Sequence, residues 1–159
     1  MRDKIKLGLI VLFAGIAVIT VWFIISNQFV VSNEQFGIYL LENDELVISD
    51  KDIISYNRTS HEIKLNQEGI DKIRTLDLCR KPFVMRLNGK TIYNGSFWSD
   101  IFSFPYSGIV ITDILAIQHG STDTVRIEPC YPPQFCEGVD PRNNYELFDY
   151  FERVGKLIR

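Results

Sequence analysis

Residues 7–26 form an unbroken apolar run, LGLIVLFAGIAVITVWFIIS, that contains no charged side chain. As a helix with a rise of about 1.5 Å per residue, this run would span roughly 30 Å, which is the thickness of the hydrocarbon core of a bilayer. The run is apolar on every face, whereas a helix at the surface of a soluble core is apolar along one stripe. The run therefore predicts a transmembrane helix that contacts membrane lipid.

The flanks of this run predict its orientation. Arg2, Lys4 and Lys6 precede it, and the ten residues that follow it include no Lys or Arg. The positive-inside rule therefore places the N-terminus in the cytoplasm and the rest of the chain outside a cell membrane crossed once. A cleaved secretory signal is the alternative, but its apolar core would be shorter and small residues would precede the cleavage site. The predicted organisation is a cytoplasmic N-terminus, an uncleaved signal-anchor, a tether and an extracytoplasmic domain, at residues 1–6, 7–26, 27–35 and 36–159.

The domain after the tether alternates short apolar runs with turn signals. Asn88-Gly89, between alternating runs at 81–87 and 90–95, is a strong hairpin signal because both central positions of this two-residue turn need positive φ. Further short strands are predicted from β-branched, aromatic and alternating apolar residues. They lie at residues 36–41, 45–49, 53–57, 61–65, 108–117 and 124–128.

Two amphipathic helices are predicted in the same domain. The first begins after the capping residue Asn66 and covers about 67–76, where Ile residues recur at helical spacing. The second covers roughly 143–157, capped by Asn143 or Asn144, with aromatic residues at three-residue steps. The fold class expected from this pattern is α+β, a small and mostly antiparallel sheet with the two helices packed on one face.

Two neighbouring segments within residues 61–92 resemble a known family. Residues 65–70 read LNQEGI at a strand-to-helix junction, and residues 83–92 read FVMRLNGKTI. The pair is similar to the periplasmic first domain of the protein-export subunit SecD, where a Leu/Phe-Thr-x-Glu-Gly-Ala helix start precedes an Ile-x-Leu-Asp-Gly-Lys-x-Ile hairpin. This resemblance implies a βαββ unit outside the membrane. SecD has several membrane helices and this chain has one such segment, so neither export activity nor any functional residue is carried over.

The cysteines predict a staple rather than a reactive site. Cys130 and Cys136 are separated by five residues that include two prolines. A zinc site would need two more ligands, and only His61, His119 and Cys79 are available, none at zinc-ligand spacing. A redox pair usually has two intervening residues at a helix start. A disulfide fits the predicted exterior location. We expect it to join the last strand to the final helix, with Cys79 buried at a helix end or, alternatively, paired between molecules; no metal or cofactor is predicted.

No catalytic constellation is recognisable. Ser60-His61-Glu62 contains the residue types of a triad, but neighbours on a strand point to opposite faces and cannot form one. We expect His61 to be a surface residue of a strand and His119 to lie in a turn. A phosphate-binding loop and a nucleophile elbow are also missing from the sequence. An enzyme is therefore not predicted.

Two groups of polar residues were candidates for binding or modification. Asp44, Asp50 and Asp52 lack the Gly and the terminal Glu of a calcium loop, so we expect them to be solvated turn residues. Asn57 and Asn94 each begin an Asn-x-Ser/Thr sequon and are candidates for glycosylation if the host has the machinery.

The aromatic stretch Phe97, Trp98, Phe102, Phe104 and Tyr106 is the main candidate for a functional surface. These residues either plug one end of the sheet or form a patch for a protein partner or the membrane surface. A net charge of -3 argues against nucleic acid as the partner. The sequence therefore predicts a membrane-anchored extracytoplasmic interaction module, for example an accessory subunit of a membrane assembly. The alternative is a binding domain for a small ligand or a cell-envelope polymer.

Overall fold

The computed structural model describes residues 36–159, which belong to one compact unit. This part of the chain contains nine β-strands and three α-helices, with single 3₁₀ turns at Asp50–Asp52 and Pro133–Phe135. In chain order the elements are β1 (Phe36–Leu40), β2 (Leu46–Ser49), β3 (Ile53–Asn57), β4 (Glu62–Leu65), α2 (Gln67–Thr75), β5 (Pro82–Leu87), β6 (Lys90–Phe97), β7 (Ile109–Thr112), α3 (Ile114–Gln118), β8 (Thr124–Glu128), α4 (Tyr145–Arg153) and β9 (Leu157–Ile158).

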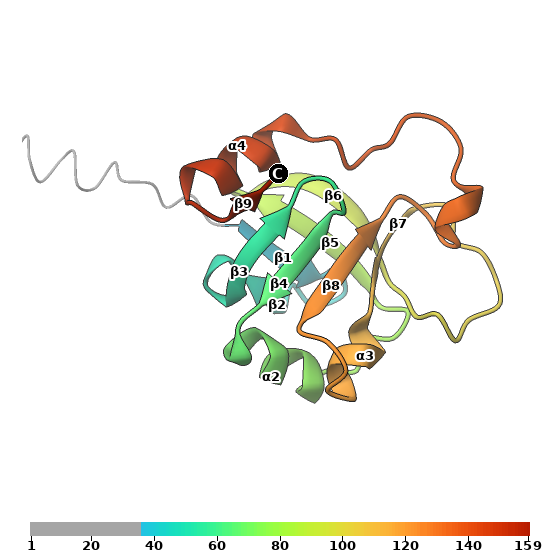
Figure 1. Cartoon of the computed structure of the whole chain (residues 1–159). Helices are drawn as coiled ribbons and strands as arrows, with labels where there is room; N and C mark the ends of the chain where they lie inside the picture. Colours follow the sequence, from blue (N-terminus) through green and yellow to red (C-terminus); the bar gives the residue numbers. More distant parts are fainter. Residues whose placement is uncertain (1–35) are drawn as a thin grey trace, which may run out of the picture. The chain divides into compact units, whose positions relative to one another are not determined.

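All nine strands belong to one sheet, in the order β2-β1-β5-β6-β7-β8-β4-β3-β9. Neighbouring strands are antiparallel except for the pairs β6–β7 and β3–β9, which are parallel. The predicted α+β class and the mostly antiparallel sheet are therefore confirmed. Helix α2 contacts both β2 and β4, which lie near opposite ends of this order. The sheet must curl strongly to bring these strands to one helix, as Figure 1 shows.

The helices close the two ends of the curled sheet (Figure 1). At one end α2 contacts α3. At the other end α4 covers the sheet, and the ring of Phe151 lies 5.1 Å from that of Phe36 in β1 and 4.9 Å from that of Tyr56 in β3. The prediction of two helices on one face is therefore wrong. The inner face of a curled sheet is filled by its own side chains, so the helices bury their apolar stripes at its open ends.

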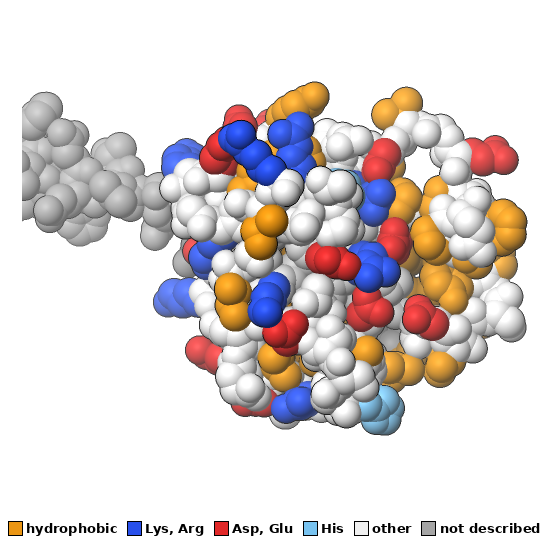
Figure 2. All heavy atoms as spheres, viewed as in Figure 1, with side chains coloured by type: hydrophobic (Ala, Val, Ile, Leu, Met, Phe, Trp, Pro, Cys, Tyr) orange, Lys and Arg blue, Asp and Glu red, His pale blue; other side chains and the backbone are white. Residues whose placement is uncertain are grey.

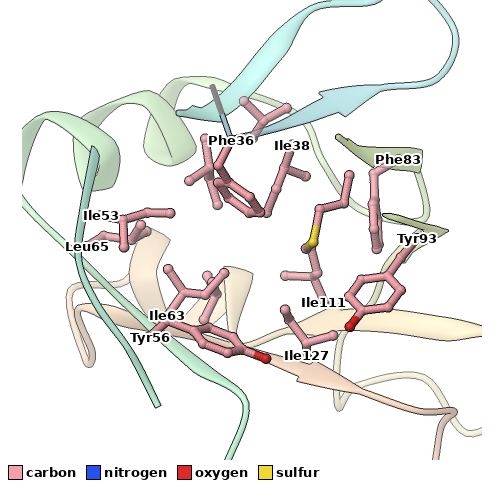
Figure 3. Close-up of a cluster of buried hydrophobic side chains, with 14 of the residues drawn as sticks. Phe36, Ile38, Ile53, Tyr56, Ile63, Leu65, Phe83, Tyr93, Ile111 and Ile127 are labelled. Atoms are coloured by element: carbon pink, nitrogen blue, oxygen red, sulfur yellow. The ribbon is translucent and has the colours of Figure 1, made fainter. Parts of the chain in front are cut away.

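The core lies inside the curl. Side chains from strands far apart in the order point toward one another there, among them Ile38, Ile63, Phe83 and Ile127, all fully buried (Figure 3). Burying a side chain of this size contributes about 1.5–3 kcal/mol relative to leaving it in water. Because the core draws on nearly every strand, the sheet and its contents are stable only together.

The predicted hairpin turn at Asn88-Gly89 and the predicted helix cap at Asn66 are both confirmed. Asn88 and Gly89 have φ values of 53° and 76° and form the turn between β5 and β6. The side chain of Asn66 accepts a hydrogen bond of 3.0 Å from the backbone N–H of Gly69, so it caps α2. The elements β4, α2, β5 and β6 follow one another in the chain, but β7 and β8 separate β4 from β6 in the sheet.

The predicted strand at 108–117 is only partly correct. β7 covers Ile109–Thr112, and the chain then turns into the short helix α3. Asp113 has a left-handed conformation with φ of 69°, which ends the extended run. Beyond it, Ile114 and Ile117 are buried at helical spacing. A continuous apolar run of this length does not distinguish a strand from a buried helix, and here it contains both.

Helix α4 begins close to the start predicted for the C-terminal helix over 143–157, but it ends earlier than predicted. Asn144 caps α4 by accepting a hydrogen bond of 3.1 Å from the N–H of Leu147. The helix ends at Arg153, and Gly155 has φ of 72°. Gly tolerates this left-handed conformation and lets the chain reverse. The last residues then form β9, a strand parallel to β3 that was not predicted.

The predicted N-terminal segments at 1–6, 7–26 and 27–35 lie outside the described residues. Across the part of the chain that is described, no helix has the length and apolar character needed to span a bilayer.

Candidate functional site

Two loops that are far apart in the sequence lie together at one side of the domain (Figure 1). The first, residues 98–108, connects β6 to β7, and the second, residues 129–141, belongs to the connection between β8 and α4. Tyr106 and Tyr131 pair as an isolated antiparallel bridge with two backbone hydrogen bonds of 2.9 Å and 2.8 Å. The Tyr131 hydroxyl also donates to the carbonyl of Asp100 at 3.3 Å. These bonds hold the two loops as one surface.

Trp98 is the centre of this surface. It follows β6 directly, its backbone N–H donates to the carbonyl of Ile111 at 2.8 Å, and its side chain is only 5% exposed. Its ring lies 5.3 Å from Phe102, 5.3 Å from Phe104 and 5.0 Å from Tyr106. Rings at these separations contribute packing energy beyond their buried area. The aromatic stretch thus builds a rigid support for the loop.

The predicted aromatic residues have two different roles. Phe97 and Trp98 are buried, Phe102 and Tyr106 are half-buried, and Phe104 is exposed. The indole Nε1 of Trp98 is buried without a hydrogen-bond partner among the described residues. Most of the stretch is therefore at least half-buried, and Phe104 is its main contribution to the outer surface.

The outer surface consists of exposed apolar side chains from both loops. They are Ile101 (73% exposed), Phe104 (43%), Phe135 (72%) and Val139 (94%), and together they are called the aromatic–disulfide face. Figure 2 shows hydrophobic side chains gathered over these loops at the right of the view. Single exposed apolar residues are ordinary, but several exposed apolar side chains on two joined loops are typical of a contact surface.

The disulfide predicted between Cys130 and Cys136 forms, with an S–S distance of 2.01 Å and a Cα–Cα distance of 5.7 Å. It closes a short loop that contains the 3₁₀ turn Pro133–Phe135. Closing a loop of about seven residues stabilises the fold by about 2.4 kcal/mol in the chain-entropy description. The bond therefore limits the motion of Phe135, which lies within the closed loop.

A groove of about 660 Å³ lies beside the disulfide. Phe135 and Val139 line it together with the carboxylate residues Glu137 and Asp140. No Lys or Arg lines this groove, so its charged side chains are all acidic. A volume of this order accommodates a small molecule or a few side chains of a partner.

Arg142 fixes the end of the second loop to the sheet. Its guanidinium donates to the carbonyl of Ile127 at 2.7 Å and to the Asp140 carboxylate at 2.7 Å. The Tyr93 hydroxyl donates to the Arg142 carbonyl at 2.6 Å. Hydrogen bonds from Arg142 hold the pKa of Asp140 below its usual value, although partial burial opposes the shift. Burial raises the pKa of Glu128, whose carboxylate lies 3.4 Å from the same guanidinium.

His61 is buried rather than exposed, so that prediction is wrong. It is 4% exposed, and its Nδ1 lies 2.7 Å from the Tyr56 hydroxyl. Burial lowers the pKa of His61, and the charge of Arg142 lowers it further, while Asp140 opposes the shift. The ring of Phe148 from α4 lies 6.2 Å from the imidazole. The sequence position before β4 gave no sign of this helix, which covers the residue from far along the chain. His119 lies exposed in a turn, as predicted.

Asp52 is a second correction, because it is fully buried and not a solvated turn residue. Its carboxylate accepts hydrogen bonds from the N–H and hydroxyl of Ser49, both at 2.6 Å, and from Lys72 of α2 at 2.9 Å. Burial alone would raise the pKa of Asp52, but these bonds outweigh it and lower the pKa. The residue joins α2 to the strand connection before β3. Asp44 and Asp50 remain at least partly exposed.

The remaining candidate residues are separate from the aromatic–disulfide face or at its margin. Cys79 is a half-buried free thiol in the loop after α2, and it lines a small cavity of about 100 Å³ with Trp98. Asn94 is exposed on β6. Asn57 is half-buried, and its side-chain oxygen accepts hydrogen bonds from the N–H groups of Thr59 and Ser60. Among the described residues, no group of three or more His, Cys, Asp or Glu side chains is placed to hold a metal ion.

Sequence reasoning missed three of the four residues of the aromatic–disulfide face. Ile101, Phe135 and Val139 are single apolar residues in loops rich in Pro, Gly and Ser, where no periodicity marks them. The available signal was the position of Phe135 inside the short loop that the predicted disulfide closes. No family model matches the chain, and comparison with curated proteins and with solved structures found no significant match.

Proposed function

We propose that this chain is a membrane-anchored, non-enzymatic interaction module that displays residues 36–159 outside the cell membrane and binds a protein partner. The observation that carries the proposal is the aromatic–disulfide face, where Ile101, Phe104, Phe135 and Val139 are exposed together. The anchor is residues 7–26, and an accessory subunit of a membrane assembly is the form of module that fits an anchor attached to one small domain.

The rigidity of the face supports a binding role. The Tyr106–Tyr131 bridge and the Cys130–Cys136 disulfide hold both loops in place before any partner arrives. Binding by a preorganised surface loses less conformational entropy than binding by a mobile loop. Exposed aromatic side chains such as Phe104 and Phe135 are of the kind enriched at the centre of protein interfaces.

The face lies far from the first residue of the described domain. Phe36, the first described residue, pairs with Leu87 beside the turn between β5 and β6. The face begins beyond Phe97, at the opposite end of β6. The seven residue steps from Lys90 to Phe97 correspond to about 23 Å at roughly 3.3 Å per residue. Phe36 and the face are thus separated by the length of β6.

Site-specific photo-crosslinking in native membranes tests the proposal. A photoreactive residue at position 135 or 139 should give a discrete adduct of higher mass, identified by mass spectrometry. Position 54 is the matched control, because Ile54 is also exposed (51%) but lies on β3. Adducts of the same identity from all three positions, or no adduct from positions 135 and 139, would contradict the proposal.

A second candidate function is binding of a small ligand or a cell-envelope polymer. The groove of about 660 Å³ beside the disulfide is the observation that favours it. Isothermal titration with soluble cell-envelope fragments would detect such binding. Heat signals that persist in Val139→Trp, which should fill the groove, would exclude the groove as the site.

A further inference from the structure

The aromatic–disulfide face has an unusual distribution of charge. The chain contains no Lys or Arg between Lys90 and Arg126, or between Arg126 and Arg142, so neither loop of the face has a basic residue of its own. The loops do contain the carboxylates Asp100, Glu137 and Asp140. The surface therefore combines exposed apolar side chains with an acidic border.

Two of these carboxylates have no cation beside them. Asp140 is bound by Arg142 at 2.7 Å, whereas Asp100 and Glu137 are exposed and form no ion pair with any residue in the described range. Glu137 lines the groove together with Phe135. An exposed carboxylate next to an apolar groove attracts a cation whose alkyl stem can lie along the apolar wall.

The aromatic rings offer a second attraction for a cation. Arg80, in the turn before β5, places its guanidinium 5.5 Å from the centre of the Phe104 ring. The Phe135 ring is 72% exposed and has no such neighbour among the described residues. A guanidinium or ammonium group over this ring would gain a cation–π interaction and could pair with Glu137 as well.

We propose that the aromatic–disulfide face binds a polypeptide segment in which Lys or Arg flanks apolar residues, with one basic side chain entering the groove beside Phe135 and Glu137. This inference rests on the proposed function and specifies the chemistry of the partner. Charge complementarity selects the occupant, because acidic residues at the border repel the anionic headgroups that attract basic proteins to membranes. Attraction between exposed charges is screened by salt, so binding should weaken as ionic strength rises.

Selection from a random twelve-residue peptide library displayed on phage tests this inference. The full chain is held in nanodiscs of neutral phosphatidylcholine and used as bait. The selected peptides should be enriched in Lys and Arg relative to the unselected library. Their affinity should fall about fivefold for each carboxylate removed in Asp100→Asn and Glu137→Gln, the upper range for an exposed ion pair. Glu68→Gln on α2, where the glutamate is exposed, is the matched control and should change nothing.

The double variant Phe135→Ser/Val139→Ser separates failure of this inference from failure of the proposed function. Both side chains are exposed, so their removal should leave the fold intact. Peptides that are lost with this variant but show no excess of Lys or Arg would overturn the inference and leave the proposed function standing. Peptides that bind the variant as well as they bind the natural chain would contradict both. Capture of anionic vesicles by the full chain in neutral nanodiscs, abolished in the double variant, would make lipid the occupant and also overturn the inference.

Discussion

The hydroxyl of Tyr56 lies 2.7 Å from Nδ1 of His61, and both side chains are buried beneath Phe148 of α4. This pair joins the strand β3 to the start of β4 under a helix from the far end of the chain. Burial, reinforced by the positive charge of Arg142 and opposed by Asp140, lowers the pKa of His61. The folded domain therefore holds the imidazole in its neutral form near neutral pH.

Acidification should destabilise the domain through His61. Its unperturbed pKa is 6.5, so below about pH 6.5 the unfolded chain binds a proton that the folded chain resists. The free energy of unfolding should therefore fall as the pH drops from 7.5 to 5.5. His61→Asn is the control, because Asn tolerates the positive φ of 54° at this position and does not titrate. Urea unfolding at both pH values measures the effect, and an equal pH dependence in the two proteins would contradict the prediction.

Asp52→Asn should destabilise the domain by about 2–3 kcal/mol. The substitution removes the charge that accepts hydrogen bonds from Ser49 and Lys72, and bonds to a charged group contribute about 1.5–3 kcal/mol each. Because the pKa of Asp52 is lowered, its contribution is fully present above the unfolded value of 3.8 and is lost as the pH falls from there through the lower pKa of the folded state. Chemical denaturation at pH 7 and pH 3 should show a larger difference between variant and natural chain at pH 7 than at pH 3.

Asp71→Asn on α2 is the matched control for this substitution. Its carboxylate is 60% exposed and pairs with Arg74 at 3.4 Å, so its removal should change stability by less than about 1 kcal/mol. A loss of stability in Asp71→Asn as large as that in Asp52→Asn would show that burial of the carboxylate is not the cause.

Gly95→Ala should destabilise the sheet at the parallel pair of β6 and β7. A Cβ at this position would lie 2.0 Å from the backbone carbonyl oxygen of Ile109, which is the register partner of Gly95. The two strands must separate to admit a methyl group, and overpacking of this kind costs about 1–3 kcal/mol or more. Thermal unfolding followed by circular dichroism measures the loss. Asn94→Ala, at an exposed neighbour on the same strand, should leave the melting temperature nearly unchanged.

The cysteines should differ in their reaction with an alkylating reagent. In membranes prepared with the reagent present, Cys79 alone should react after unfolding, and Cys130 and Cys136 should react only after reduction, since they form the disulfide. Mass spectrometry with and without reductant counts the modified thiols. Free reaction of all three before reduction would place the domain in a reducing compartment and contradict the predicted exterior location.

Loss of the disulfide should affect the loop more than the core. Cys130→Ser/Cys136→Ser should reduce the free energy of unfolding by about 2.4 kcal/mol, the value for closing a loop of about seven residues. The aromatic–disulfide face should lose its crosslinks at position 135, while the sheet remains folded. Unfolding curves of the double variant and of the reduced natural chain should coincide. Different curves would show that the serine substitutions change stability in addition to removing the disulfide.

Several features could be predicted because they depend on a few adjacent residues. The turn at Asn88-Gly89 and the cap at Asn66 are local, so their backbone conformations follow from the identity of those residues. The disulfide could also be predicted, since six positions separate its cysteines and few other pairings compete. The apolar run at 108–117 could not be divided correctly, because its apolar residues continue on both sides of Asp113, where the left-handed conformation ends the strand.

The sequence by itself determined the apolar segment 7–26, the α+β class, the main turns and the cysteine loop, all of which depend on composition or short spacing. Only the tertiary structure decided that the sheet curls, that α4 buries His61, and that the loops 98–108 and 129–141 meet. Such contacts join residues that are remote in the chain, and their free energy comes from burying apolar area shared by many elements. No short stretch of sequence contains that information, which is why the exposed members of the aromatic–disulfide face emerge only once the two loops are placed together.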